Sequence, residues 1–549
     1  MEVAAQDIAL ITLLLIISAV GIATLWLRLP YPIALVLAGL ALGAIIHSPL
    51  PLFHDLPIDT LEFTPHLILV VFLPALLFEA TLHLEVTTLR KTLLPIGLLA
   101  LPGVVITALI VGALVSWGVG IDGPTAMLFG AIVAATDPIA VLAIFKRLGA
   151  PHELAVLIEG ESLLNDGTAV VLSRILLGAV LAGSFSITSG IVQFGVVVGG
   201  GLLVGLFTGM LVSRLTARID DHLIEITLTT ILAYGTFMAA EALGFSGVIA
   251  VVVAGLVLNN IGARHSTSPT TRLALLTFWE YIAFLLNSAI FLLIGLQVDL
   301  ANLALNLLPI GIAVAAVLLA RAIVVYGLGL IVLPLPPVLP LRWLHVLFWA
   351  GMRGALSLAV VLSLPLELPA RALLLNLTYG VVLFSLLVQG LTMRPLLAWL
   401  GLIADDQQRQ IYHARRAELL LLRAGLRELR RLEEDAVLSP RVYAQLDAQY
   451  RVDGAQVETA LEGLYQHQSA FEAEEQRSTQ IHLLQVERST LQELRRQGLV
   501  DDDTSRKLAE SLDTRLMAAR SGATDQAASV ATDAAAADEP AGDAPEAGM

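Results

Sequence analysis

Apolar stretches long enough to cross a bilayer recur along most of this 549-residue chain, and they constrain its fold more than any other feature. A transmembrane helix needs about 20 predominantly apolar residues. Hydrophobic residues make up 57% of the sequence and the mean hydropathy is +0.81, values that are exceptional for a soluble protein. The sequence therefore predicts an all-α polytopic membrane protein.

About thirteen spans are expected when each must supply about 20 apolar residues. Their predicted limits are 8–27, 31–47, 66–84, 94–117, 123–145, 152–178, 188–213, 223–243, 245–259, 273–298, 304–333, 343–364 and 372–399. An external N-terminus places most basic loop residues, including Lys146, Arg214 and Arg342, on the cytoplasmic side, with Arg371 as the clear exception. An odd number of spans then places the C-terminal tail in the cytoplasm.

The chain changes character near residue 400. Residues 1–400 carry 15 basic and 20 acidic side chains, whereas residues 401–549 carry 17 and 27. Leucine stripes predict a helical cytoplasmic domain over 401–520, with a regulatory or dimer-contacting role as one hypothesis, and the composition of 521–549 predicts an acidic disordered tail. Nothing indicates nucleic-acid binding, a cofactor or enzyme chemistry, and the absence of cysteine excludes thiolate metal sites.

Two neighbouring spans contain many carboxylates for sequence this apolar. Asp137 follows Thr136 in the span at 123–145, and Glu159, Glu161 and Asp166 lie in the next span, at 152–178. An ionisable group at the bilayer centre costs roughly 2.5–3.5 kcal/mol on insertion scales, so it needs a partner or a function. The alternative, a polar network that only fixes helix packing, does not need so many carboxylates. The two spans are therefore the predicted ion site.

Helical spacing gathers the polar groups of the second span on one side. Ser162 and Asp166 are four residues apart and share a face, as do Glu161 and Asn165. The two faces are adjacent. A polar cluster is therefore expected to project from one side of this helix.

The span at 123–145 is expected to break near Thr136 and Asp137. Pro138 lacks a backbone N–H and disfavours helix at the residue before it. Free backbone groups within a membrane are tolerated where they line a cavity, which is how many secondary transporters build ion sites. The hydroxyl, carbonyl and carboxylate oxygens here are hard ligands that suit a small alkali cation.

The segments 135–143 and 159–169, which read ATDPIAVLA and EGESLLNDGTA, closely resemble the sodium/proton exchangers of the monovalent cation–proton antiporter family (NhaP/NHE-like). The resemblance covers roughly residues 8–400. It implies exchange of Na⁺ (or Li⁺) for H⁺ by alternating access in the cell inner (plasma) membrane, and a homodimer. It also fits inverted repeats of spans 1–6 and 8–13, with two broken helices that cross at the midplane.

Asp166 is the predicted central group of the exchanger. A carboxylate that binds either a proton or a cation couples the two by competition, because each must leave before the other binds. Thr136, Asp137 and Ser162 are the other expected cation ligands. In the family, a neutral Asn165 beside Asp166 resembles the electroneutral exchangers, so the resemblance implies one proton for each cation.

Two arginines of the second half are expected to support the site. Glycines on both sides of Arg353 predict a second helix break, and the resemblance pairs Arg353 with Glu161. Arg321 matches a family arginine but has no assigned partner. A buried arginine of this kind neutralises acidic groups and holds the broken helix ends.

Other charged residues have weaker predicted roles. Glu79 matches a family glutamate, which favours a cation ligand or part of the cytoplasmic mouth over a glutamate that only reaches water from a helix end. Arg174 is interpreted as a residue that packs or reaches water from the outer end of its helix, and Glu241 and Glu280 are placed near helix ends, where they reach water. Glu159 receives no role.

Three alternatives remain open from the sequence. A K⁺/H⁺ antiporter would use the same oxygen ligands, because cavity size decides selectivity and sequence does not give it. A cation channel would pass ions without coupled proton movement. A sensor whose membrane part only anchors the tail would leave the intramembrane carboxylates unexplained.

Overall fold

The computed structural model contains α-helices and short π-helices, with no β-strand in the described part of the chain. The described residues are 2–27, 30–46, 68–84, 86–184, 186–217, 219, 221–262, 269–332, 340–402, 406–435, 437–467, 469–497 and 499–521. The predicted disordered tail lies outside this part from residue 522 onward. The chain divides into two compact units, Met1–Ile403 and Ala404–Met549.

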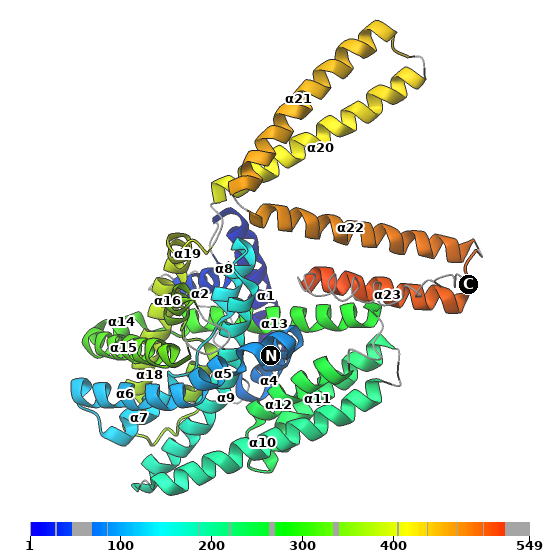
Figure 1. The fold of residues 1–549 in the computed structure, drawn as a ribbon. Coiled ribbons are helices and arrows are strands. Elements are labelled where there is room, and N and C mark those ends of the chain that lie inside the picture. Colours follow the sequence, from blue (N-terminus) through cyan, green and yellow to red (C-terminus); the bar gives the residue numbers. More distant parts are fainter. Residues whose placement is uncertain are drawn as a thin grey trace, which may run out of the picture. The chain divides into compact units, whose positions relative to one another are not determined.

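One set of helices in the first unit, called the first group here, packs around α12 and α13 (Figure 1). Its members are α1 (Glu2–Leu27), α2 (Tyr31–Ile46), η3 (Ile68–Phe72), α4 (Leu73–His83), α10 (Ile187–Thr216), α11 (His222–Ala242), α12 (Gly247–Val257), η4 (Leu258–Gly262) and α13 (Pro269–Leu296). The buried Trp279 of α13 ties three of these helices together. Its ring lies 4.8 Å from that of Phe78 of α4, and its indole N–H donates to Thr229 of α11 at 3.1 Å.

The remaining helices of the first unit are called the crossing group. They are α5 (Val86–Ala100), α6 (Pro102–Val119), α7 (Gly123–Ile132), α8 (Ile139–Leu148), α9 (His152–Ala182), α14 (Leu300–Leu305), α15 (Leu307–Val332), α16 (Leu341–Trp349), α17 (Ala355–Leu362), α18 (Arg371–Phe384), η5 (Ser385–Gln389) and α19 (Gly390–Trp399). Val141, Leu157 and Leu347, from α8, α9 and α16, share one buried apolar cluster. This core holds α8 and α9, from the N-terminal part of the crossing group, against α16, from its C-terminal part.

Two predicted spans contain non-helical segments, at residues 133–138 and 350–354. Helix α7 begins after Asp122, whose carboxylate accepts a hydrogen bond from the Thr125 N–H at 3.1 Å. The chain leaves the helix before Pro138 and resumes as α8 directly after it, as expected for a residue without an N–H. Between α16 and α17, the interruption contains the two glycines that flank Arg353.

Helix occupies most of each of the thirteen predicted spans. Among the described residues, seven helical segments are long and apolar enough to cross a membrane, and five shorter apolar helices accompany them. The period and length of the apolar pattern thus located the helices without structural information.

The described part of the second unit contains four helices that pair in chain order, α20 with α21 and α22 with α23 (Figure 1). They are α20 (Asp406–Glu434), α21 (Pro440–His467), α22 (Ser469–Arg496) and α23 (Asp502–Ser521). The buried Tyr412 packs against Val457 and Leu461 between the first two. Pro440 begins α21, and Gly454 lies inside this helix.

Candidate functional site

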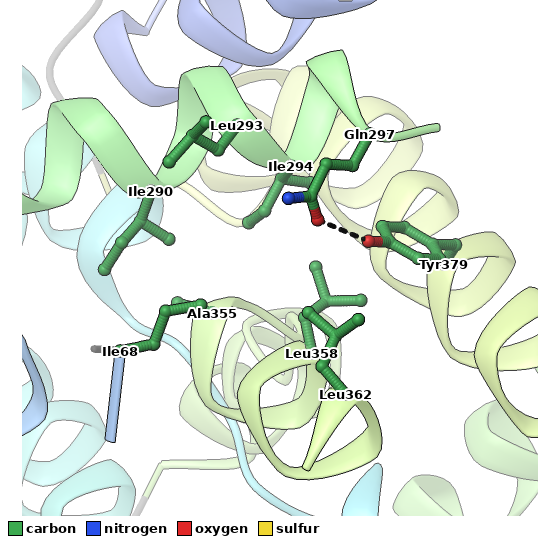
Figure 2. A pocket seen from close by; sticks show the side chains of 9 residues that line it. All are labelled: Ile68, Ile290, Leu293, Ile294, Gln297, Ala355, Leu358, Leu362 and Tyr379. Carbon is green, nitrogen blue, oxygen red and sulfur yellow. Dashed lines mark hydrogen bonds between the residues drawn. The ribbon is translucent and has the colours of Figure 1, made fainter. Parts of the chain in front are cut away.

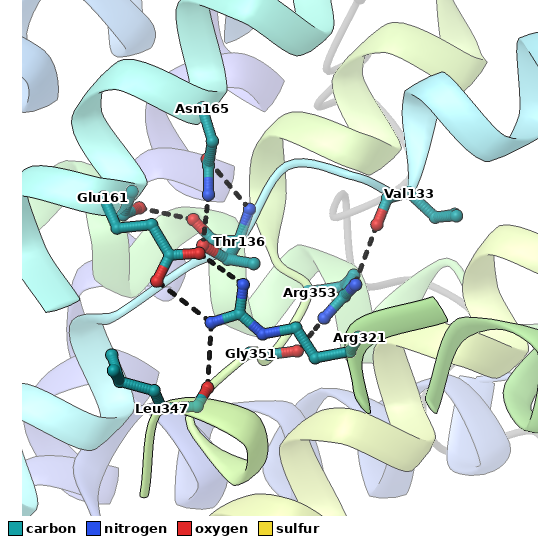
Figure 3. Close-up of polar contacts among 9 residues, drawn as sticks. Val133, Thr136, Glu161, Asn165, Arg321, Leu347, Gly351 and Arg353 are labelled. Carbon is teal, nitrogen blue, oxygen red and sulfur yellow. Dashed lines mark hydrogen bonds and ion pairs between the residues drawn. The ribbon is translucent and has the colours of Figure 1, made fainter. Parts of the chain in front are cut away.

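Thr136 is the centre of a polar network between the first interruption and α9 (Figure 3). Its N–H donates to Asn165 Oδ1 at 3.2 Å, and Asn165 Nδ2 donates to Thr136 Oγ1 at 2.6 Å. Ser162 Oγ donates to the Thr136 carbonyl. These bonds replace helical hydrogen bonds that the interruption removes, so Asn165 and Ser162 fix the position of the non-helical chain.

Asp137 joins the two interruptions. Its N–H donates to the Met352 carbonyl at 2.7 Å, and its Oδ1 accepts the Ile139 N–H at 3.0 Å. The carboxylate also has a hydrogen bond to the Ala355 backbone, and a Cβ atom added to Gly354 would collide with it. Asp137 therefore lies at the N-terminal ends of both α8 and α17, where helix dipoles favour an anion.

Arg353 lies at the opposite kind of helix end. Its Nε donates to the Val133 carbonyl at 2.8 Å, directly after the last residue of α7, and its Nη1 donates to the Gly351 carbonyl (Figure 3). The side chain is buried. A cation is favoured at a helix C-terminus, so Arg353 stabilises the carbonyl end of α7.

The expected pairing of Arg353 with Glu161 is wrong, because Arg321 is the partner of Glu161. Both guanidinium Nη atoms of Arg321 contact the two Glu161 carboxylate oxygens, with Nη2 and Oε2 3.0 Å apart. Arg321 Nη2 also donates to the Leu347 carbonyl, in the last turn of α16, at 2.8 Å. Arg353 therefore lies at the C-terminal end of α7, and Arg321 lies at the C-terminal end of α16. Glu161 neutralises the charge of Arg321.

Asp166 differs from the other carboxylates of this region. Its Oδ1 is buried and has no hydrogen-bond partner in the described part of the chain. It lies one turn beyond Ser162 on α9 and is close enough to Asp137 for the two carboxylates to interact electrostatically. The structure thus brings Asp166 to the same region as the oxygens of Thr136, Ser162 and Asp137, the expected cation ligands.

Glu79 belongs to a separate acidic cluster. His83 Nε2 lies 3.0 Å from Glu79 Oε1 and 3.7 Å from Glu280 Oε1, and Glu159 is close enough to interact electrostatically with His83 and Glu79. Glu280 lies well inside α13, not near its end as expected. The cluster gives Glu159 a position that its sequence context did not indicate.

Arg174 and Glu241, interpreted from sequence as separate packing and helix-end residues, contact each other. Arg174 Nη1 donates to both Glu241 carboxylate oxygens, at 3.1 and 2.8 Å. Glu241 Oε1 also accepts the Gly247 N–H at 3.1 Å, at the start of α12. These contacts join α9 of the crossing group to α11 and α12 of the first group.

The sequence interpretation missed two serines that fix the second interruption. Ser357 Oγ donates to the Ile132 carbonyl at 2.8 Å, so α17 caps the last turn of α7. Ser385 Oγ accepts the Arg353 N–H at 3.0 Å. A hydroxyl within an apolar span was the available signal, but many such hydroxyls bond only to their own helix.

Comparisons with known proteins agree with this architecture. A sequence profile described as the sodium/hydrogen exchanger, transmembrane family matches residues 10–399. The Na⁺/H⁺ antiporter ApNhaP of Aphanothece halophytica is 43% identical, over 75% of this chain and 78% of that protein. The Na⁺/H⁺ antiporter NhaG of Bacillus atrophaeus is 37% identical, over 87% and 91%.

A solved structure shares the fold. The sodium proton antiporter MjNhaP1 of Methanocaldococcus jannaschii superimposes with a TM-score of 0.61 at 23% identity, covering 73% of this chain and 99% of that one. The family profile spans nearly all of the first unit. This chain therefore belongs to the sodium/hydrogen exchanger family, whose members are multi-pass membrane transporters and not enzymes.

Proposed function

We propose that this protein exchanges Na⁺ (or Li⁺) for H⁺ across a membrane, and that the two ions compete for Asp166. The observation that carries the proposal is the buried Asp166 Oδ1, which has no hydrogen-bond partner in the described part of the chain. A buried carboxylate oxygen left this way is costly unless a proton or a cation satisfies it. Either ion satisfies it, and both cannot do so together.

The partners of the neighbouring charges support an electroneutral exchange. Glu161 is neutralised by Arg321, and Asp137 has backbone hydrogen bonds at two helix N-termini. Asp166 is therefore the group at which a proton and a cation replace each other. One proton leaves for each cation that binds, so the charge at the site stays constant through the cycle.

The cation ligands in this proposal are oxygens from the first interruption and from α9. Asp166, Asp137 and Ser162 supply side-chain oxygens, and Thr136 supplies its hydroxyl or carbonyl. Such hard ligands suit alkali cations. Glu79 is assigned to the cytoplasmic mouth, where its cluster with His83 gives an approaching cation a negatively charged surface.

The proposed topology has thirteen spans, an external N-terminus and a cytoplasmic tail, in the cell membrane. The hydrogen bond between Asp137 and Met352 supports two broken helices that cross at the site, as expected for inverted repeats. The apolar outer face of α10, where Phe207 and Ile191 are 70% and 68% exposed, is assigned to lipid or to a second copy of the chain in a homodimer.

Proton flux in proteoliposomes tests the exchange directly. A pH-sensitive dye reports the response to Na⁺, Li⁺ or K⁺, added in turn to the parent chain and to Asp166→Asn. We expect a response to Na⁺ or Li⁺ that disappears in the variant. The matched control is Asp122→Asn, which removes a carboxylate at the start of α7, outside the polar network, but keeps an oxygen to cap that helix.

Each other outcome has a distinct meaning. A response to K⁺ alone would keep the mechanism and change the substrate. Cation flux without proton movement would favour a channel. Exchange that persists in Asp166→Asn would exclude competition at this residue, whatever the cation.

A further inference from the structure

A narrow pocket lies between the two helix groups (Figure 2), and its lining includes Ala355, the first residue of α17, whose backbone contacts Asp137. Ile290 and Ile294 of α13 line it from the first group, and Leu358 and Leu362 of α17 line it from the crossing group. Its free volume is about 20 Å³, which is room for about one water molecule. A hydrated cation does not fit, so this seam between the groups is closed.

A hydrogen bond closes one end of the pocket. Tyr379 of α18 donates its hydroxyl to Gln297 Oε1, just beyond α13, at 3.0 Å (Figure 2). Tyr379 is 8% exposed. Because the other lining side chains are apolar, this bond is the polar link between the two walls of the pocket. Gln297 is exposed, so the bond is partly buried, with its phenol end in the wall of the pocket and its amide end open to water.

The ion pair between Arg174 and Glu241 also joins the two groups. It connects α9, which packs mainly on α5 and α7, with α11, which packs mainly on α10, α12 and α13. The side chains of Arg174 and Glu241 are 50% and 27% exposed. A pair so accessible to water forms and breaks at low cost.

Both contacts lie toward the same face of the membrane. Arg174 and Glu241 are in the C-terminal parts of α9 and α11, and Gln297 follows the C-terminus of α13. In the proposed topology these three helices end outside. Tyr379 is in the first third of the helical segment Arg371–Trp399, which begins outside.

We propose that the Tyr379–Gln297 bond and the Arg174–Glu241 pair are two latches that keep the site around Asp166 closed to the external side. Both contacts separate when this site opens outward. The inference rests on the proposed alternating-access exchange. It assigns these residues to control of the external opening and not to ion binding, because none of them belongs to the network around Thr136. The apolar walls of the pocket exclude water and ions from the external side, and the two latches determine how often the walls separate.

The absence of cysteine from the sequence allows a direct test. Leu358→Cys places one thiol in the pocket wall, where the native side chain is 3% exposed. A charged, membrane-impermeant thiol reagent added to intact cells reaches this position only from outside. Labelling should be slow in the otherwise unchanged full-length chain.

Removing a latch should accelerate the labelling. We expect about fivefold for Tyr379→Phe, which loses one partly buried hydrogen bond, about twofold for Glu241→Gln, which loses an exposed pair, and about the product of the two in the double variant. The matched control is Tyr234→Phe. Its hydroxyl donates to the Val71 carbonyl at 3.0 Å, within the first group, so it should leave the rate unchanged.

A second reporter, Ile294→Cys, repeats the measurement from the opposite wall in case the first variant folds poorly. Unchanged rates in the latch variants at both reporters would overturn the proposal, as would an equal rise in Tyr234→Phe. Sodium-driven proton flux of the parent chain is measured separately. If that flux is absent the exchange proposal fails, while the labelling rates still report whether the latches control the opening.

Discussion

One arginine–carboxylate pair from each unit shows how burial changes what the same contact does. In the first unit, the side chains of Arg321 and Glu161 are 7% and 2% exposed and contact each other through two pairs of atoms. In the second unit, Arg423 and Glu458 are 56% and 52% exposed. Water can replace either partner of the exposed pair, whereas no water replaces a partner of the buried one. The same chemistry is thus a structural requirement in the buried pair and a minor contribution in the exposed one.

The difference between buried and exposed pairs explains how the proposed ion site can be stable in an apolar environment. Every charge near the interruptions has a fixed counterpart: Arg353 and Arg321 lie at helix C-termini, and Asp137 lies at helix N-termini. Against this compensated background, Asp166 Oδ1 is a buried carboxylate oxygen without a hydrogen-bond partner in the described part of the chain; Arg321 Nε also lacks one, but the rest of that guanidinium is paired with Glu161. A site whose other charges are neutralised can exchange one proton for one cation without carrying an additional charge through the membrane.

The largest predicted effect comes from breaking the buried pair. Arg321→Leu leaves Glu161 charged and buried, so we expect the free energy of unfolding to fall by about 3–5 kcal/mol. Thermal unfolding of the purified protein in detergent measures the loss. Arg174→Leu is the control in the same unit, because its exposed pair contributes at most about 1 kcal/mol. Equal losses in the two variants would contradict the contrast between buried and exposed pairs.

A smaller effect is expected where backbone packs against the site. A Cβ atom at Gly354 would collide with the Asp137 carboxylate, so Gly354→Ala should displace that carboxylate from the helix ends. Overpacking costs about 1–3 kcal/mol, and we expect exchange to fall about tenfold. Gly178→Ala is the control, because nothing lies within 4 Å of a Cβ atom there. Proton flux in proteoliposomes measures both, and full activity in Gly354→Ala would contradict the close packing.

Ser162 offers a comparison within a single helix. Ser162→Ala removes a cation ligand and the hydrogen bond to the Thr136 carbonyl, so the Na⁺ concentration for half-maximal exchange should rise about fivefold. Ser173 is also buried on α9, but its Oγ has no hydrogen-bond partner in the described part of the chain. Ser173→Ala should therefore leave that concentration unchanged. Equal shifts in the two variants would mean that Ser162 acts only through packing.

The sequence predicted the interruption at Thr136 and Asp137 because proline acts locally: the missing N–H of Pro138 ends the preceding helix wherever the segment packs. The shared face of Ser162 and Asp166 was predictable for the same reason, since helical spacing is a local property. Groups that neighbouring residues position were therefore accessible without structural information.

Pairings between distant helices were not accessible in this way. Arg321 and Arg353 lie in consecutive spans, and both suit Glu161 by charge, so spacing could not choose between them. The choice depends on the direction from which α15 approaches α9. Tyr379 and Gln297 gave even less signal, because a phenol and an amide are neutral and occur at many helix ends. Their contact follows from packing between the groups.

The smallest predicted effect lies in the second unit and completes the comparison. Arg423→Ala removes the exposed pair with Glu458, whose closest atoms are 2.8 Å apart, and should lower the unfolding free energy of this unit by at most about 1 kcal/mol. Unfolding of the full-length chain is measured at about 0.01 M and 1 M salt, because the Debye length falls from about 30 to 3 Å over that range. The effect of Arg423→Ala should disappear at high salt, whereas that of Arg321→Leu should persist, because dissolved ions cannot screen a pair that water does not reach. If both effects persisted, exposure would not be what separates the two kinds of pair.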